Sequence, residues 1–338
     1  MRYTAQDFKS DQEVKWCPGC GDHSILASVV KAMPEVCEAL NYTKERFVFV
    51  SGIGCSSRFP YYMDTYGFHG IHGRATALST GIKCANPTLT VWQVTGDGDA
   101  LAIGGNHFIH AIRRNIDINI LLFNNRIYGL TKGQYSPTSK LGLVTKTSPY
   151  GTVEHPFNPG SLVLGARGTF FARSLDVEMK LSQSIMVAAA KHDGTSVMEM
   201  LVNCVIFNDG THKDISDKAV RADRTIVLKH GEPMIFGAKK DKGLVLDGMS
   251  LKVVTIGENG ITEADLLVHD SKTDNIGIHS MLADMKYPEF PVALGVIRNV
   301  EDKTYDDNVR DQVAEVRASA KIKSVDQLLH SGATWEVK

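Results

Sequence analysis

The sequence lacks any long apolar run and any excess of charge of one sign. No stretch approaches the ~18 apolar residues that a membrane-spanning helix needs. The formal net charge is −1, so the chain has no electrostatic footprint of nucleic-acid or membrane-surface binding. The first ten residues have neither the apolar core nor the cleavage pattern of a signal peptide. We therefore expect a soluble, cytoplasmic protein that binds neither nucleic acid nor membrane.

Cysteine is also scarce, with six residues in a chain of 338. Two of them form a CxxC pair, Cys17 and Cys20, and in a chain without a secretion signal such a pair indicates metal or redox chemistry. A thioredoxin-like dithiol would follow a strand directly, but a polar segment, residues 10–15, precedes this pair. A zinc knuckle would need a second close pair, whereas the other cysteines are scattered. An iron–sulfur cluster tolerates scattered ligands, because the fold can gather them.

Two of the scattered cysteines follow predicted strands. Cys55 lies in a glycine-rich loop after the apolar run 47–50, and Cys204 follows the apolar run 196–202. Both should therefore lie at the carboxyl edge of one sheet. Cys37 and Cys84 fall in helical apolar patterns, which is typical of small buried residues. We predict a [4Fe–4S] cluster on Cys17, Cys20, Cys55 and Cys204.

A second pattern joins Gly96-Asp97-Gly98-Asp99 to a twin asparagine at residues 124–125. The runs 89–95 and 116–123 read as buried strands and residues 100–115 as a helix, which together form one β-α-β unit. Asp97 and Asn125 then follow strand ends, where parallel sheets bind ligands. With the backbone carbonyl of Ile127 they offer three hard oxygen ligands, and two diphosphate oxygens and a water would complete the octahedron that suits Mg²⁺. Each half is a common turn by itself, but the combination resembles the thiamine-diphosphate signature.

The rest of the chain fits one large domain with an extension. Strand-like and helix-like segments alternate up to about residue 202, which predicts an α/β fold with a doubly wound, mostly parallel sheet of the diphosphate-binding type. We assign residues 1–230 to the cofactor domain and 231–338 to a C-terminal extension that packs on a partner subunit. Residues 135–160 lack periodicity and should form a long ordered loop over the site or at an interface.

Five motifs between residues 16 and 210 carry a specific resemblance: WCPGCGDH, SGIGCSSRFP, HGRATALSTGIK, GDGDALAIGGNHFIHA and FNNRIYGLTKGQYSPTS. They resemble the β subunits of 2-oxoacid:ferredoxin oxidoreductases, most closely the 2-oxoglutarate type. The resemblance implies thiamine diphosphate, Mg²⁺ on Asp97, Asn125 and Ile127, and one [4Fe–4S] cluster on the four cysteines above. The thiamine contacts that it implies are Ile53, Gly54, Cys55, Ser56, His72, Gly73, Gly96, Gly98, Asp99, Gly129 and Leu130.

Two of the implied residues have plain structural alternatives. The basic residue that faces the 2-oxoacid falls on Arg58, where some relatives carry lysine, and Arg58 could instead be a solvated surface charge. His72 is the second candidate catalytic residue, and it could instead be a loop histidine bonded to backbone. The glycines around His72 and the position of Arg58 three residues after Cys55 favour the site.

The resemblance also implies the reaction and its partners. A 2-oxoacid is decarboxylated on thiamine diphosphate, coenzyme A takes the acyl group, and the cluster passes electrons to ferredoxin; the reverse, reductive direction is equally open. The chain has no room for a pyrimidine-binding domain before residue 230, so an α or fused γα subunit must supply it together with the activating glutamate. Such a heterodimer would pair into a heterotetramer about a two-fold axis.

Three alternatives stay open on the sequence. One is a pyruvate-using or broad 2-oxoacid:ferredoxin oxidoreductase. Another is a non-redox thiamine-dependent decarboxylase or carboligase subunit whose cysteines are structural. The last is a zinc-stabilised scaffold that has lost catalysis.

Overall fold

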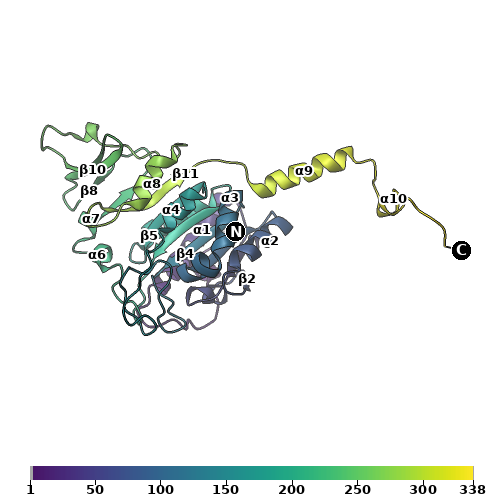
Figure 1. The fold of residues 1–338 in the computed structure, drawn as a ribbon, viewed down its shortest axis with the longest axis horizontal. Helices are drawn as coiled ribbons and strands as arrows, with labels where there is room; N and C mark the ends of the chain where they lie inside the picture. Colours follow the sequence, from purple (N-terminus) through teal and green to yellow (C-terminus); the bar gives the residue numbers. More distant parts are fainter. Residues whose placement is uncertain (1–2, 338) are drawn as a thin grey trace.

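The computed structural model describes residues 3–337 and is built on one eight-stranded sheet with helices on both faces (Figure 1). The strand order is β2-β1-β3-β4-β6-β5-β11-β7. Neighbouring strands run parallel except β11 and β5, which are antiparallel. This confirms the predicted doubly wound, mostly parallel α/β fold. The strands are β1 (Phe47–Ser51), β2 (Tyr66–His69), β3 (Thr90–Gly96), β4 (Asn119–Asn124), β5 (Phe170–Leu175), β6 (Ser196–Leu201), β7 (Thr225–Leu228) and β11 (Val292–Asn299).

The central strands are buried on both faces, which explains why they read as continuous apolar runs. Successive side chains of a strand point to opposite faces, and the chain builds a separate core on each. Phe47 and Phe49 of β1 belong to the core beneath α1 (Asp22–Leu40) and α5 (Met179–Ala190). Val48 and Val50 belong to the other core, which lies beneath four further helices. These are α2 (Ala75–Ala85), α3 (Gly105–Arg114), α4 (Pro159–Gly165) and α8 (Ile276–Asp284).

The helix predicted over residues 100–115 is interrupted. A π-helical turn, Asp99–Ile103, is followed by Gly104, and only then does α3 begin. A side chain at Gly104 would place its Cβ 2.4 Å from the carbonyl oxygen of Asp99. The backbone of Gly104 therefore packs directly against that of Asp99. π-Helical turns of this kind recur at functional sites.

The C-terminal third adds two small helices, a second sheet and an arm. The short helices α6 (Lys213–Ser216) and α7 (Arg221–Arg224) lead into β7. The antiparallel sheet contains β8 (Ile235–Phe236), β9 (Lys242–Asp247) and β10 (Ser250–Thr255). The arm contains α9 (Tyr305–Ser319) and α10 (Val325–Leu329), and it extends away from the sheet (Figure 1).

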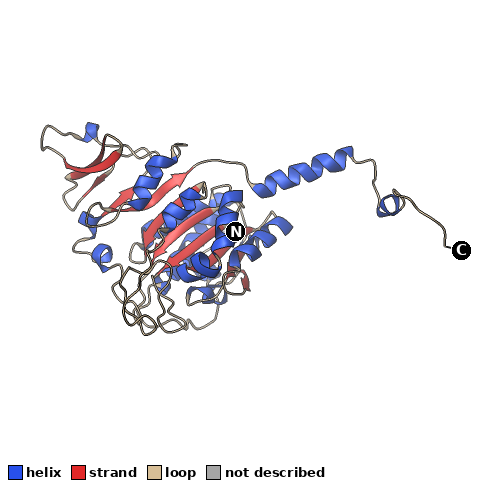
Figure 2. Ribbon diagram, in the orientation of Figure 1, coloured by secondary structure: helices blue, strands red, loops and turns tan. Residues whose placement is uncertain are grey.

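The division of the chain at residue 230 stays a prediction. Whatever the boundary, β11 comes from beyond residue 230 and lies inside the main sheet, between β5 and β7. The sequence predicts a long loop over residues 135–160. In the structure residues 125–158 form a long connection without a helix or strand of their own, and α4 begins at Pro159; the connection lies among the tan loops at one end of the sheet (Figure 2). Among residues 3–337, no helix combines the length and apolar character that crossing a bilayer needs.

Candidate functional site

A cleft opens where β1, β3 and β4 end, at the carboxyl edge of the sheet. Its cavity volume is about 90 Å³. The cleft contains the predicted metal ligands and every predicted thiamine contact except Gly73. Its lining residues are Ile53, Gly54, Cys55, Ser56, His72, Gly96, Asp97, Gly98, Asp99, Phe123, Asn125, Ile127, Tyr128, Gly129, Leu130 and Thr131.

Asp97 is buried at the floor of this cleft. The hydroxyls of Ser136 and Thr138 each lie 2.5 Å from its Oδ2 atom and donate to it. Burial nevertheless raises the pKa of Asp97 to about 6, because the hydroxyl and backbone hydrogen bonds offset only part of the desolvation. A carboxylate that is costly to ionise in its own protein is well suited to a cation, and a divalent ion would remove that cost.

The other two predicted metal ligands lie on one turn. The side-chain oxygen of Asn125 accepts a hydrogen bond from the backbone N–H of Ile127, at 3.1 Å, which folds the turn after β4. Within residues 3–337, no three His, Cys, Asp or Glu side chains are grouped around a single metal position. The predicted Mg²⁺ ligands include only one such side chain, since the others are an amide oxygen and a backbone carbonyl. The hard oxygen donors at this end of the cleft therefore fit Mg²⁺.

Asp99 holds the walls of the cleft together. Its Oδ1 atom accepts hydrogen bonds from the backbone N–H groups of Ile53 and Gly73, at 3.2 and 2.6 Å, and Nδ1–H of His72 donates to the same atom at 2.5 Å. Its Oδ2 atom accepts from Thr95, at 2.8 Å. A buried carboxylate, and not the backbone, therefore orients His72. Gly73 does not line the cleft, but it is bonded to the same carboxylate.

The four predicted cluster cysteines gather beside the same cleft. A Cβ atom at Gly129 would lie 3.5 Å from Sγ of Cys55 and 3.6 Å from Sγ of Cys204. Burial raises the pKa of Cys55 to about 12, and the nearby charges of Asp22, Cys204 and Cys17 act in the same direction. Burial, Asp22 and the sulfurs of Cys204 and Cys55 likewise raise the pKa of the Cys20 thiol.

This arrangement fits a cluster better than a single ion. The sulfurs do not converge on one metal position, whereas in a [4Fe–4S] cluster four cysteines ligate the cluster together. Gly129 leaves the space in front of two of the sulfurs free of any side chain. Cys37 is buried in the core beneath α1, as predicted. Cys84 is exposed on α2, so its predicted burial is wrong; the helical pattern placed it at the rim of the apolar face.

Arg58 does not line the cleft. It lies on the 3₁₀ turn Ser56–Tyr62, exposed, and its Nε–H donates to the hydroxyl of Tyr62 at 2.9 Å.

Several residues that the sequence did not single out complete the site. Ser136 and Thr138 bond Asp97, and Trp16 donates its indole N–H to the carbonyl of Cys55 at 2.7 Å. The hydroxyl of Tyr128 donates to the carbonyl of Gly98 at 2.9 Å, and a Cβ on Gly98 would collide with the tyrosine ring at 2.2 Å. The SPTS run, residues 136–139, is the one signal for these contacts, because hydroxyl residues in a loop can fold onto a buried acid.

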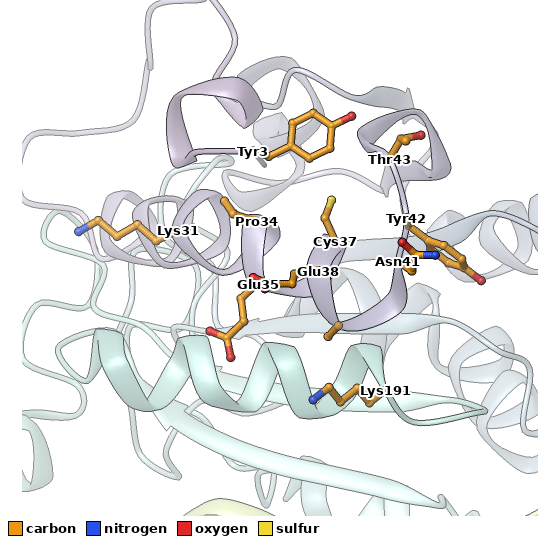
Figure 3. Close-up of a pocket in the computed structure, with 11 residues that line it drawn as sticks. Tyr3, Lys31, Pro34, Glu35, Cys37, Glu38, Asn41, Tyr42, Thr43 and Lys191 are labelled. Atoms are coloured by element: carbon orange, nitrogen blue, oxygen red, sulfur yellow. The ribbon is translucent and has the colours of Figure 1, made fainter. Parts of the chain in front are cut away.

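A larger hollow lies elsewhere (Figure 3). It has a volume of about 1050 Å³ and is lined mainly by the C-terminal half of α1 together with Tyr3, Tyr42, Thr43 and Lys191. None of the predicted site residues lines it.

Known proteins match the chain over the same region and beyond. Residues 52–200 match the family described as thiamine pyrophosphate enzyme, C-terminal TPP binding domain. Over 337 residues the chain is 50% identical to 2-oxoglutarate oxidoreductase subunit KorB of Mycobacterium tuberculosis, which covers 98% of this chain and 88% of that relative. The chain belongs to the β subunits of the 2-oxoacid:ferredoxin oxidoreductases.

Two further relatives support this membership. The chain is 45% identical over 189 residues to 2-oxoglutarate synthase subunit KorB of Archaeoglobus fulgidus, which covers 56% of this chain and 69% of that one. In three dimensions it matches the 2-oxoglutarate:ferredoxin oxidoreductase from Magnetococcus marinus, solved with 2-oxoglutarate, coenzyme A and succinyl-CoA bound. The TM-score is 0.76 at 31% identity, and the match covers 97% of this chain and 95% of that one. The predicted family is confirmed, and this β subunit is part of an oxidoreductase.

Proposed function

We propose that the chain is the β subunit of a 2-oxoglutarate:ferredoxin oxidoreductase. With its partner subunit it would convert 2-oxoglutarate, coenzyme A and two oxidised ferredoxins into succinyl-CoA, CO₂, a proton and two reduced ferredoxins, or catalyse the reverse. The observation that carries the proposal is the single cleft at Gly129, where the oxygen donors of the metal site and the cysteine sulfurs meet. The names and bound molecules of the relatives at 50% and 31% identity support 2-oxoglutarate as the substrate.

Asp97, Asn125 and the carbonyl of Ile127 would hold Mg²⁺, and the glycines of residues 96–98 let the backbone approach a diphosphate closely. Thiamine diphosphate, when bound, supplies the electron sink for carbon–carbon bond cleavage at a 2-oxoacid. Cys55 belongs to both halves of the site, since it lines the cleft and its sulfur faces Cys204 across Gly129. A cluster on Cys17, Cys20, Cys55 and Cys204 would therefore lie within short electron-transfer reach of the cleft.

The chain's own basic residues would orient substrate. Asp99 fixes the His72 ring at the mouth of the cleft, where it can exchange a proton with a bound group. Toward the described residues Arg58 donates only its Nε–H, which leaves its terminal nitrogens for a charge-assisted pair with a carboxylate of a dicarboxylic substrate.

The proposal includes the partners and the location. An α or fused γα subunit would supply the pyrimidine-binding domain and its glutamate, ferredoxin would accept the electrons, and residues 231–338 would pack on the partner. A cytoplasmic location follows from the free cysteines, which a reducing compartment preserves.

The test is an anaerobic analysis of the enzyme purified with its partner subunit. We expect thiamine, iron and sulfide in the amounts of one thiamine diphosphate and at least one [4Fe–4S] cluster per β subunit, with turnover of 2-oxoglutarate faster than of pyruvate. Cys204→Ser should lower the iron content and the broad visible absorbance, while Cys37→Ser, a buried cysteine outside the site, should change neither. Unchanged iron in Cys204→Ser, or loss of iron in Cys37→Ser, would contradict the ligand assignment. Thiamine without iron would indicate a non-redox enzyme.

A further inference from the structure

A second cavity, of about 210 Å³, lies behind the metal site, between the carboxyl ends of β4, β5 and β6 and the end of α8. We propose that it is a binding site for a phosphate group, either free or as the end of a larger molecule. The site goes beyond the proposed function and does not depend on it. The charged residues that line the cavity are Arg126, Lys140, Arg173, Glu199, Asp284 and Lys286.

This cavity is separate from the cofactor cleft, although both use the same turn. Phe123, Asn125 and Ile127 line the cleft, whereas Asn124 and Arg126 line the cavity. Successive residues after β4 thus face opposite sides, and the two hollows share no lining residue.

The most deeply buried pair of charges in the cavity is already satisfied. Arg173 Nε–H donates to Glu199 Oε2, and Asn124 donates its side-chain N–H to Glu199 Oε1, each at 2.7 Å. A second guanidinium nitrogen of Arg173 donates to the carbonyl of Ala283, at 3.2 Å. Both side chains are almost fully buried, so the negative charge of Glu199 is committed to Arg173.

The remaining cations have no such partner. Asp284 lies exposed at the rim, where it accepts a hydrogen bond from Asn158, at 3.0 Å. Within the part of the chain that the structure describes, the ion pairs include neither Arg126 nor Lys140 nor Lys286. Among the lining residues, four cations face two carboxylates, an excess of two positive charges, which is the charge that a phosphate dianion neutralises. The carboxylates of Asp97 and Asp214 also lie near Arg126, but neither lines the cavity.

Arg126 is the centre of the site. Its backbone is in the left-handed region, at φ 57°, and its carbonyl accepts hydrogen bonds from Ser139 and Asn208 at 2.6 and 3.2 Å. The backbone is therefore fixed, while the half-buried guanidinium has no hydrogen-bond acceptor among residues 3–337.

The chemistry favours phosphate over a single carboxylate. A guanidinium presents a planar pair of N–H donors that matches two phosphate oxygens, and an ammonium adds a mobile point charge. Lys140 and Lys286 lie where they can supply that charge. The volume suits a small group with a few waters and is less than a drug-sized ligand needs.

The experiment is a calorimetric titration of the assembled enzyme with inorganic phosphate. The enzyme is first saturated with thiamine diphosphate and Mg²⁺, so that phosphate cannot bind at the cofactor cleft, and chloride keeps the ionic strength constant. We expect one phosphate per β subunit. Arg126→Asn, which suits the left-handed backbone, should weaken binding by about tenfold or more, as expected for loss of a charge-assisted pair.

Two further variants keep the test decisive. Lys140→Met should weaken phosphate binding several-fold, and it carries the test if Arg126→Asn fails to assemble. Lys146→Met, an exposed lysine of the same loop outside the cavity, should bind phosphate as the unaltered enzyme does. The absence of saturable phosphate binding, or equal affinity in the unaltered enzyme, Arg126→Asn and Lys140→Met, would overturn the proposal.

Competition then identifies the source of the phosphate. If coenzyme A displaces inorganic phosphate and 3′-dephospho-coenzyme A does not, the occupant is the terminal phosphate of coenzyme A. If both displace it equally, the occupant is the diphosphate of coenzyme A, and if neither does, the site takes free phosphate or another phosphorylated molecule. Each of these results requires the site to exist.

Discussion

Three buried carboxylates at the carboxyl edge of the sheet have different hydrogen-bond partners, and the partners define what each can do. Asp97 is bonded on one oxygen by two hydroxyls and is a candidate metal ligand. Asp99 is bonded by backbone N–H groups, His72 and Thr95, so it holds the cleft together. Glu199 is paired with Arg173 and is a structural charge. Burial alone would not have distinguished them.

Removal of the hydroxyl at residue 138 tests the role of Asp97. Thr138→Val should weaken Mg²⁺-dependent binding of thiamine diphosphate by about ten- to a hundredfold, the size of one hydrogen bond to a charged group, while Asp97→Ala should abolish it. Thr138→Ser keeps the hydroxyl and should restore binding. Thr152→Val, which removes a buried loop hydroxyl that bonds Lys140 and not Asp97, is the control. Calorimetry that finds Thr138→Val equal to the unaltered enzyme would refute the role.

His212 predicts a dependence of stability on pH. Burial lowers the pKa of His212 to about 3, and Nε2–H donates to the carbonyl of Asn124 at 2.9 Å. In the unfolded chain His212 binds a proton near pH 6.5, whereas in the folded chain it stays neutral until about pH 3. The contribution of His212 to the free energy of unfolding is therefore fully present above pH 6.5 and falls as the pH drops toward 3.

The comparison of unaltered protein with His212→Gln isolates this effect. The difference in free energy of unfolding between the two should shrink by up to ~1.4 kcal/mol for each pH unit below 6.5. Urea unfolding of the assembled enzyme at pH 7.5, 6.5 and 5.5 measures it. A difference that stays constant over this range would show that His212 is not the group that titrates.

Among the elements, the break between the π-helical turn and α3 depends on two adjacent glycines with different surroundings. A Cβ at Gly104 would lie 2.4 Å from the Asp99 carbonyl oxygen and 3.1 Å from Cα of Gly73, both backbone atoms that cannot move aside. A Cβ at Gly105 would have nothing within 4 Å.

Alanine substitutions should therefore act in opposite directions at these two positions. Gly104→Ala should destabilise the fold by about 1–3 kcal/mol through overpacking. Gly105→Ala should be neutral or stabilise by up to ~1 kcal/mol, because alanine favours the helix. Thermal unfolding of both variants measures the contrast, and similar midpoints would mean that the break is not sterically required.

The elements that the sequence predicts are those whose signal is local. Strands such as β3 and β4 are predicted correctly because both faces are buried and most of their residues are apolar. The edge strand β2 is exposed along its length and has no such signal. β11 was missed because its partners β5 and β7 are distant in the sequence, and its pairing with β5 contains an irregularity between Val296 and Arg298.

The candidate site follows the same rule. Asp97, Asn125, Cys55 and Cys204 could be placed from the sequence because each follows a strand of one parallel sheet. Ser136 could not, since it reaches Asp97 across 39 residues through a loop without periodicity. The charges around Arg126 depend on the same loop and on α8, so the second cavity has no sequence signature.

At the scale of the whole molecule, the chain has one cofactor cleft and an arm. The arm helix α9 has exposed apolar residues, Val309, Val313 and Val316, at helical spacing along its length. It leaves the sheet at the end opposite α6 (Figure 1). These features agree with a subunit that completes its site and covers its arm only in an assembly.

The chain alone should therefore be inactive. Reconstituted anaerobically with cluster, Mg²⁺ and thiamine diphosphate, it should not turn over 2-oxoglutarate with coenzyme A and ferredoxin, because the proposal places the glutamate that activates the cofactor on the partner. Addition of the partner subunit should restore turnover, and a partner that lacks this glutamate is the matched control. Full turnover by the lone chain would refute the partner requirement.

The position of β11 also has a consequence for synthesis on the ribosome. Chains emerge from the N-terminus and fold as they emerge, but the edge of β5 cannot be paired until residues 292–299 have been made. β7 must wait as well, since its partner in the sheet is β11. For more than a hundred residues of translation the nascent chain therefore carries an open strand edge, a template for pairing with other chains. Chaperone dependence and aggregation during expression should be governed by this interval, and a chain that stops before β11 should aggregate even though it contains the complete cleft.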